Sequence, residues 1–258
     1  MTAQQNPLEF LAFCISRTIN DHEVVYAGTG LPLVGALLAK ATHAPHITLV
    51  FESGSQDPVF TMRMPWSVSC PWTYHLAPLT LDMATSFGQV AAGYIDLSFM
   101  GGAQIDMYGN VNTTVIGSME KVKHRLPGSG GANDLGSLSE RYVLVGLQTK
   151  EKFPERVDFI TTPGHLNGGD SRQKAGLLGS GPEQVITQVG VFGFHPESKR
   201  MMALTLHPGI TPEIVAMCTG FEIIIPDDVG VTELPDETTL EILRTKVDPY
   251  RVFTNFPV

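Results

Sequence analysis

The most constraining feature of the sequence is a short apolar segment that leads into a glycine turn, a helical segment and a second apolar segment. Residues 24–27 are predicted as a buried strand, and Gly28-Thr29-Gly30 follows directly. Residues 31–42 are apolar at helical spacing, and Pro32 falls in the first turn, where its missing N–H costs no hydrogen bond. Residues 47–51 are apolar enough for a parallel strand buried on both faces. This order predicts a βαβ unit with a right-handed crossover.

The rest of the chain extends the same α/β pattern. Apolar spacing predicts further helices at residues 7–19, 81–92, 212–217 and 238–246. It predicts further strands at 94–100, 142–147, 156–160 and 222–225, with a hairpin of 185–194 and 201–206. Residues 126–136 and 163–182 are predicted as glycine-rich, irregular segments, and no internal repeat or linker is found. We therefore expect one α/β domain over residues 1–258. It should have an open, mostly parallel sheet flanked by helices and antiparallel additions in its second half.

Composition and charge exclude several classes of protein. Hydrophobic residues make up 43% of the 258 residues and charged residues 17%, which is typical of a globular protein with a sizeable core. The formal net charge of -9 argues against nucleic acid and anionic membranes as partners, because both favour a basic surface. A small anionic ligand held by backbone N–H groups is still compatible with this charge.

Cysteine and histidine patterns predict neither disulfides nor a metal site. The three cysteines, Cys14, Cys70 and Cys218, are far apart and form no metal-ligand spacing, and the histidines are scattered. The N-terminal segment lacks the basic region of a signal peptide, and no apolar run of 18 residues occurs. We expect reduced thiols, no metal, no membrane span and a cytoplasmic protein.

An acidic residue directly follows the second strand of the βαβ unit. Glu52, with Ser53 and Gly54 behind it, lies where open α/β sheets place their ligands. A carboxylate at such a position costs folding free energy unless it is hydrogen-bonded, so its presence suggests a role in binding or catalysis. A helix cap or a solvated loop acid is the alternative. The glycine turn at 28–30 could likewise present N–H groups to an anion or be only a tight strand-to-helix turn.

Two further glycine motifs offer contacts for a ligand. Residues 101–106 (GGAQID) follow a predicted strand and are followed by Tyr108-Gly109-Asn110, so a ligand could approach the backbone there, or the Asx residues could cap their own turns. Residues 128–134 (GSGGAND) could form an anion-binding nest or an oxyanion hole. A flexible linker is the alternative for this second motif.

Taken in order, these blocks resemble the class I CoA-transferases, and most closely the β subunit of glutaconate CoA-transferase. The resemblance is carried by GTGLPLVGALLAK, VFESG, GGAQIDMYGNVNTT and GSGGAND, and it runs from about residue 6 to the Asp248-Pro249 pair. Each block alone is weak evidence, and their combination is specific. Residues 55–75 differ from the corresponding stretch of that family, so the preferred substrate can differ from glutaconate.

The resemblance implies a fold, a partner and a set of site residues. The fold is that of CoA-transferases and of NagB/RpiA-like proteins. The active site of such enzymes lies between a β subunit and a homologous α subunit in a heterodimer or heterotetramer. Glu52 corresponds to the catalytic glutamate. The implied substrate- or CoA-binding residues are Ser53, Gly54, Gly101, Gly102, Gln104, Asp106, Gly130, Gly131, Ala132 and Asn133.

The implied reaction moves CoA between carboxylic acids by ping-pong kinetics. A Glu52 carboxylate would attack an acyl-CoA thioester to give an anhydride and then a glutamyl-CoA thioester, with coenzyme A as substrate and no permanently bound cofactor. The acid would be glutaconate or a related dicarboxylate. Two alternatives remain open: a CoA-thioester hydrolase, decarboxylase or carbon–carbon lyase on the same scaffold, and a non-catalytic assembly subunit.

Overall fold

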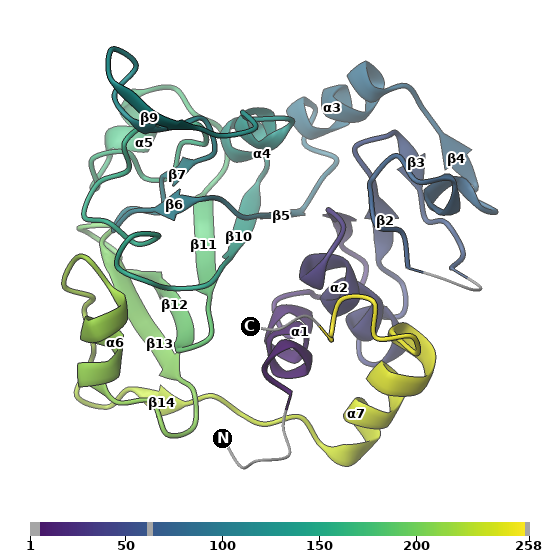
Figure 1. Ribbon diagram of the computed structural model, residues 1–258. Coiled ribbons are helices and arrows are strands. Elements are labelled where there is room, and N and C mark those ends of the chain that lie inside the picture. The colour runs from purple at the N-terminus through teal and green to yellow at the C-terminus, as the bar shows by residue number, and fades with distance from the viewer. Residues whose placement is uncertain (1–5, 61–63, 256–258) are drawn as a thin grey trace. The chain divides into compact units, whose positions relative to one another are not determined.

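The computed structural model describes residues 6–60 and 64–255, which form two compact units. The first unit comprises residues 1–99 and 233–258, and the second comprises residues 100–232. Figure 1 shows the helices and strands of both. The expectation of one domain over residues 1–258 stays a prediction.

The first unit contains the predicted βαβ unit. Strands β1 (Val24–Tyr26) and β2 (Thr48–Val50) pair in parallel, with Tyr26 opposite Val50, and β5 (Leu97–Met100) pairs in parallel with the other side of β1. Two short antiparallel strands, β3 (Ser55–Gln56) and β4 (Leu79–Thr80), extend the sheet beyond β2, so its order is β5-β1-β2-β3-β4. The parallel strands carry fully buried apolar side chains, as the sequence predicts.

Helices of the first unit come from both ends of the chain. Helix α1 (Pro7–Ser16) begins at Asn6, whose side chain accepts a hydrogen bond from the Leu8 N–H. It packs on α2 (Leu31–Ala41), and α7 (Glu237–Ile242) returns beside α2, as Figure 1 shows. The remaining helical elements are α3 (Met83–Ala91), the turn η1 (Pro71–Tyr74) and the π-helical turn η2 (Leu243–Val247).

An ion pair joins the two ends of the chain within this unit. The buried Glu9 carboxylate of α1 accepts two hydrogen bonds from the Arg244 guanidinium, at 3.0 Å from Nε and 2.6 Å from an Nη atom. Two parallel hydrogen bonds from one guanidinium fix its direction as well as its distance. The C-terminal helical segment is therefore attached to α1 by a directional contact in addition to apolar packing.

The second unit is built around a mixed sheet. Its strand order is β14-β13-β12-β11-β10, with parallel pairing of β10 to β11 and of β13 to β14, and antiparallel pairing between. The strand bounds are Arg141–Val145 (β10), Gly181–Ile186 (β11), Gly190–Phe194 (β12), Met201–Leu206 (β13) and Gly230–Val231 (β14). Two hairpins lie outside this sheet, β6 (Gln104–Ile105) with β7 (Val111–Asn112) and β8 (Val115–Gly117) with β9 (Val122–Arg125). The helices are α4 (Ala132–Leu138), α5 (Ser171–Lys174) and α6 (Pro212–Cys218).

The α/β class is confirmed, and antiparallel additions occur in both units. Four local predictions are wrong. Residues 156–160 form irregular, bent backbone, and 222–225 contribute one isolated bridge between Met202 and Ile224. The predicted hairpin is confirmed between β12 and β13, but residues 185–194 are divided by a turn between β11 and β12, and the predicted loop 126–136 ends inside helix α4. The three strand errors reflect pairing with distant backbone, which short-range pattern does not encode.

Candidate functional site

Glu52 lies at the tip of a tight turn at the carboxyl end of β2. The Gly54 N–H donates to the Phe51 carbonyl at 2.8 Å, and the Phe51 N–H donates to the Ser55 carbonyl at 3.0 Å. Glu52 and Ser53 are the two central residues of this turn, and both are partly exposed. The structure therefore presents the carboxylate on a short, hydrogen-bonded connection between β2 and β3.

The turn is packed closely against Leu81 and Tyr74. Gly54 has a φ of 94°, a conformation that favours glycine, and a Cβ added there would lie 2.0 Å from the Leu81 carbonyl oxygen. The Leu81 N–H donates back to the Gly54 carbonyl at 2.9 Å, and the Tyr74 hydroxyl donates to the Ser53 carbonyl at 3.1 Å. Tyr74 and Leu81 thus hold the turn from outside, which the sequence pattern alone does not predict.

Two unpaired hydroxyl groups lie within three residues of Glu52 in the sequence. The Oγ atoms of Ser53 and Ser55 are buried and have no hydrogen-bond partner among the described residues. A buried hydroxyl without a partner carries a desolvation cost that a bound polar group would relieve. The segment that carries Glu52 therefore contains two unsatisfied polar groups.

The glycine turn of the βαβ unit lies at the same edge of the first unit's sheet. Parallel pairing places the carboxyl ends of β1 and β2 together, and the Ala27 N–H donates to the Val50 carbonyl at 3.0 Å. Helix α2 begins after Gly30, which provides no side-chain cap. The first N–H groups of this helix are therefore available to an anion on the side of the sheet where Glu52 lies, as the strand order predicts.

The other predicted binding residues belong to the second unit. Gly101 and Gly102 are packed against backbone and side chains: an added Cβ would lie 2.8 Å from the Val145 carbonyl oxygen at Gly101, and 2.2 Å from Val111 Cγ1 at Gly102. These glycines are thus required by close packing. A role in admitting a ligand to the backbone stays a prediction.

The side chain of Gln104 is used inside the fold. Its Oε1 accepts from Asn112 Nδ2 at 2.7 Å and from the Asp158 N–H at 3.0 Å, and its Nε2 donates to Asp158 Oδ2 at 3.2 Å. The side chain is almost fully buried. These contacts tie the β6–β7 hairpin to residue 158, so any contact with CoA would have to displace them.

Asp106 is likewise buried and hydrogen-bonded. Its carboxylate accepts from the Tyr108 and Asn110 N–H groups and from Asn110 Nδ2, at 3.0–3.1 Å. Burial raises the pKa of this carboxyl, and the hydrogen bonds from Asn110 and Tyr108 oppose that rise. The geometry is that of an Asx residue capping its own turn, one of the two interpretations that the sequence leaves open.

The loop that contains Gly130 and Gly131 is exposed at its tip and anchored at its end. Gly130 has a φ of 49°, Ala132 begins helix α4, and Asn133 Nδ2 donates to the Thr161 carbonyl at 2.8 Å. The loop is therefore a strand-to-helix connection with a defined exit, and the flexible-linker alternative does not describe it.

The structure brings the two glycine motifs of the second unit together at Thr113. A Cβ on Gly102 would lie 3.3 Å from Thr113 Cγ2, and the Gly128 N–H donates to the Thr113 carbonyl at 2.8 Å. The Oγ1 atoms of Thr113 and Thr162 are buried without a partner among the described residues. These threonines are not predictable from the sequence, because nothing in their local pattern distinguishes them from other threonines of the chain. The remaining predicted site residues, Glu52, Ser53 and Gly54, belong instead to the first unit.

Within residues 6–60 and 64–255, Asp21, His22 and His46 form one cluster of metal-ligand side-chain types, although its two imidazole rings are not arranged to share an ion. Asp21 accepts from the His46 backbone N–H at 2.7 Å and from His46 Nδ1 at 2.8 Å, and His22 stacks on His46 with an interplanar angle of 4°. A metal lies near the plane of each imidazole that binds it, so parallel rings cannot both bind one ion without rotation. The hydrogen bonds from His46 lower the pKa of Asp21 to about 2. The expected absence of a metal stays a prediction.

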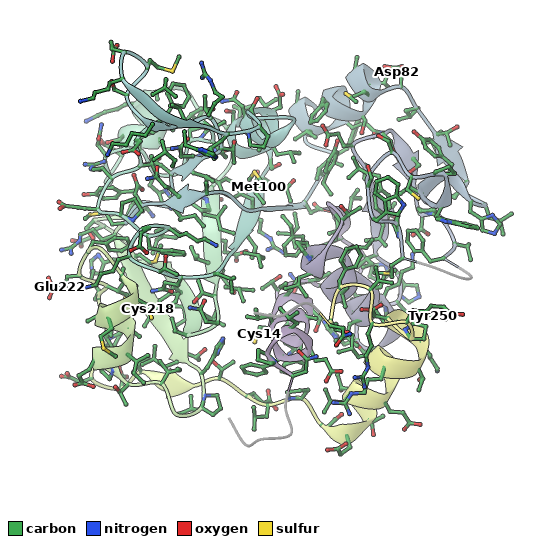
Figure 2. The ribbon with its side chains drawn as sticks, in the orientation of Figure 1. Cys14, Asp82, Met100, Cys218, Glu222 and Tyr250 are labelled. Carbon is green, nitrogen blue, oxygen red and sulfur yellow. The ribbon has the colours of Figure 1, made fainter. Side chains whose placement is uncertain are left out.

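The three cysteines are free thiols. Figure 2 shows Cys14 on α1 and Cys218 on α6, and Cys14 and Cys70 are buried. Burial raises the pKa of Cys14 to about 12, which keeps it protonated and unreactive at neutral pH. In the parts of the chain that the structure describes, no helix is both long and apolar enough to cross a membrane.

Two buried histidines predict a loss of stability in mild acid. Burial, with smaller contributions from Lys199 and Arg172, lowers the pKa of His165 to about 4, and burial also lowers the pKa of His207. Between about pH 6.5 and pH 4 the unfolded chain binds more protons than the folded chain, so the free energy of unfolding falls as pH falls. His165 alone should contribute about 3 kcal/mol over this range.

This prediction is checked by urea unfolding between pH 7 and pH 4. The His165→Gln variant, whose side chain does not titrate, should show a shallower decline of the free energy of unfolding than the parent chain. A His124→Gln variant changes an exposed histidine of β9 and should keep the parental slope. Equal slopes in all three proteins would contradict the assignment.

Comparison with known proteins identifies the family of the chain. Residues 9–217 match the model of the family described as "Coenzyme A transferase". The chain is 36% identical over 241 residues to the B subunit of 3-oxoadipate CoA-transferase from Pseudomonas knackmussii, covering 92% of this chain and 91% of the relative. It is 34% identical over 259 residues to the B subunit of glutaconate CoA-transferase from Acidaminococcus fermentans, covering 96% and 95%.

A solved structure of a relative shares the fold of this chain. The crystal structure of glutaconate coenzyme A-transferase from Acidaminococcus fermentans superposes with a TM-score of 0.91 at 33% identity, covering 98% of this chain and 99% of the other. Both curated relatives are B subunits of transferases and match at nearly full length. The chain therefore belongs to the coenzyme A transferase family and corresponds to the B subunit of such an enzyme.

Proposed function

We propose that this chain is the B subunit of an enzyme that moves CoA between two carboxylic acids through covalent intermediates on Glu52. The observation that carries the proposal is the Glu52 turn. It holds a partly exposed carboxylate at the carboxyl end of β2, in a β2–β3 connection whose two serine hydroxyls are buried without partners among the described residues. A partly exposed carboxylate in a fixed position is suited to attack a bound thioester.

The proposed chemistry needs no proton transfer in its covalent steps. A Glu52 carboxylate oxygen bonds to the thioester carbonyl carbon, the C–S bond breaks, and CoA leaves as a thiolate, which gives a mixed anhydride. The thiolate then attacks the Glu52 carbonyl carbon and releases the first acid as its carboxylate. A second carboxylate repeats these steps in reverse order. Backbone N–H groups near the glycine turns would stabilise the oxyanions, and the kinetics would be ping-pong.

The acid is proposed to be dicarboxylic. The two curated relatives are named for glutaconate and 3-oxoadipate, and both of these acids carry a second carboxylate. A dicarboxylate of similar length is therefore the substrate class to test first. Coenzyme A enters as a substrate, and the absence of a permanently bound cofactor stays a prediction, as does the cytoplasmic location.

A homologous α subunit is proposed to complete the active site, in a heterodimer or a heterotetramer. The relatives' names as B subunits support this assignment. The isolated chain should transfer CoA at least about 100-fold more slowly than the chain co-expressed with its α subunit, because half of the positioning contacts are missing. Initial rates with a dicarboxylate and acetyl-CoA or succinyl-CoA measure this. Full activity from the chain alone, at equal protein concentration, would refute the two-subunit arrangement.

Chemical trapping tests the covalent mechanism directly. The co-expressed subunits are incubated with an acyl-CoA, treated with hydroxylamine or borohydride, and digested for peptide mass analysis. We expect a hydroxamate or an alcohol at Glu52, formed only when acyl-CoA is present. Thioester turnover without a second acid and without modification of Glu52 would instead favour a hydrolase, decarboxylase or lyase on this scaffold.

A further inference from the structure

In the Glu52 turn, the peptide unit that joins Ser53 to Gly54 is hydrogen-bonded at both of its ends. Its N–H, which belongs to Gly54, donates to the Phe51 carbonyl at 2.8 Å. Its carbonyl, which belongs to Ser53, accepts from the Tyr74 hydroxyl at 3.1 Å. A peptide unit is planar, so a rotation that moves its carbonyl also moves its N–H. The orientation of this unit is therefore fixed while both hydrogen bonds are made.

The backbone on either side of this peptide unit is anchored as well. Phe51 is fully buried, and its carbonyl oxygen lies 3.4 Å from Ser86 Oγ in addition to its bond with the Gly54 N–H. The Gly54 carbonyl accepts from the Leu81 N–H at 2.9 Å. Glu52 thus stands between two anchored pieces of backbone. Since the direction of its side chain is set by the backbone that carries it, these contacts aim the carboxylate.

Tyr74 is a suitable anchor because the helical turn η1 that carries it is itself held in place. The preceding residue, Thr73, is fully buried, and both its N–H and its hydroxyl donate to the Cys70 carbonyl, at 2.9 and 2.8 Å. The Val59 N–H donates to the carbonyl of the following residue, His75, at 2.9 Å. A tyrosine side chain has only two torsions to fix. The hydroxyl of Tyr74 is therefore delivered to the Ser53 carbonyl from a rigid support.

The hydrogen bond from Tyr74 adds little to folding. It lies at the surface of the first unit, and the Tyr74 side chain is 41% exposed. Water can replace an exposed hydroxyl as a donor to a carbonyl at small net cost in stability. A water molecule, however, does not fix the direction of that carbonyl as a side chain on a rigid support does. What the hydroxyl supplies is orientation of the peptide unit next to Glu52.

We propose that Tyr74 is a positioning residue for Glu52: its hydroxyl fixes the Ser53–Gly54 peptide unit and thereby the direction from which the carboxylate meets the thioester. The inference rests on the proposed function, because it concerns the reaction of Glu52. Tyr74 exchanges no proton with the substrate in this role and forms no bond to it. A displacement of about 1 Å at a reacting group costs up to about 100-fold in rate, so small rotations of this peptide unit are expected to matter.

Tyr74→Phe tests the proposal, because it removes the hydroxyl oxygen and keeps the ring. In the chain co-expressed with its α subunit, we expect kcat to fall about 10-fold while KM for acyl-CoA and for the acid stays within about twofold. The single-turnover rate at which the trapped Glu52 adduct forms should fall by the same factor. The urea concentration at the unfolding midpoint should not change, since the lost hydrogen bond is exposed.

Tyr94→Phe is the matched control. Tyr94 also belongs to the first unit and is 67% exposed, and no hydrogen bond of its hydroxyl occurs within the described part of the chain. This variant removes the same atom from an exposed tyrosine that does not contact the Glu52 turn. Its kcat, KM and unfolding midpoint should all match those of the parent enzyme.

The kinetic pattern separates positioning from other roles. A kcat equal to that of the parent enzyme would overturn the assignment of Tyr74. A raised KM with an unchanged kcat would also overturn it, because that pattern belongs to a residue that binds the substrate. A loss of rate that only follows a loss of folded protein, shown by a lower unfolding midpoint, would make Tyr74 a structural residue instead.

Glu52→Gln, measured beside Tyr74→Phe, separates failure of this inference from failure of the proposed function. If Glu52→Gln is inactive and Tyr74→Phe is fully active, Glu52 keeps its role and Tyr74 loses the one assigned to it. If Glu52→Gln still transfers CoA, both the proposed function and the inference are wrong. An inactive Glu52→Gln together with a folded Tyr74→Phe of reduced kcat and parental KM supports both.

Discussion

Replacing Glu52 with glutamine is expected to lower the transfer rate by at least about 10⁴-fold, because the amide that remains cannot form the anhydride. The substitution keeps the size of the side chain and adds no Cβ branch. Glu52 is partly exposed at the tip of its turn, so the free energy of unfolding should change by less than about 0.5 kcal/mol. Steady-state rates and urea unfolding of the co-expressed subunits measure the two effects separately.

Two further variants sharpen this test. Glu52→Asp retains the carboxylate but withdraws it by one methylene, and it should also lose most of its activity because the attacking oxygen is misplaced. Glu120→Gln changes an exposed acid of the second unit and should leave the rate within about twofold. Substantial transfer by Glu52→Gln, with purity confirmed by mass, would remove Glu52 from the mechanism.

Replacing Gly54 with alanine is expected to destabilise the protein by about 3 kcal/mol or more and to lower activity with it. The φ of 94° disfavours any residue with a Cβ, and that Cβ would lie 2.0 Å from the Leu81 carbonyl oxygen. Backbone must shift to relieve the contact, and the Gly54–Leu81 hydrogen bond would be strained. Since Glu52 is two residues away in the same turn, its carboxylate would move.

Gly88→Ala is the matched control for this prediction. Gly88 lies within α3, has an ordinary φ, and a Cβ there would meet nothing within 4 Å. Alanine in a helix interior is favoured over glycine, so this variant should be more stable than the parent by up to about 1 kcal/mol. If Gly54→Ala unfolds at the same urea concentration as the parent, the described packing of the turn against Leu81 is incorrect.

The local elements can be predicted wherever the signal is short-range. The helix after Gly30 and the strands on either side of it follow from apolar spacing, the glycine turn and Pro32, all within residues 24–51. Helix α6 is predicted at nearly its observed bounds because proline in a first helical turn is a local preference. The apolar residues of 156–160 predict a strand, yet a strand requires a neighbouring backbone to pair with, and no described strand pairs along this segment.

The candidate site can be predicted only in part, for the same reason. The position of Glu52 at a strand end is readable from the sequence, and its role comes from resemblance to a family. The unpaired hydroxyls of Ser53, Thr113 and Thr162 are not predictable, because a side chain's lack of a partner is visible only when its whole surroundings are known. Gln104 and Asp106 look available for a ligand in the sequence but are occupied by internal hydrogen bonds.

By itself, the sequence determined the α/β class, the βαβ unit, the acidic residue at its strand end and the family. These depend on periodicity, turn chemistry and residue order, which are local properties of the chain. The tertiary structure alone decided that Leu81 closes on Gly54, that the Tyr74 hydroxyl donates to the Ser53 carbonyl, and that Arg172 donates to four separate carbonyls. Hydrogen-bond satisfaction and burial depend on which distant segments meet, and no local pattern specifies that.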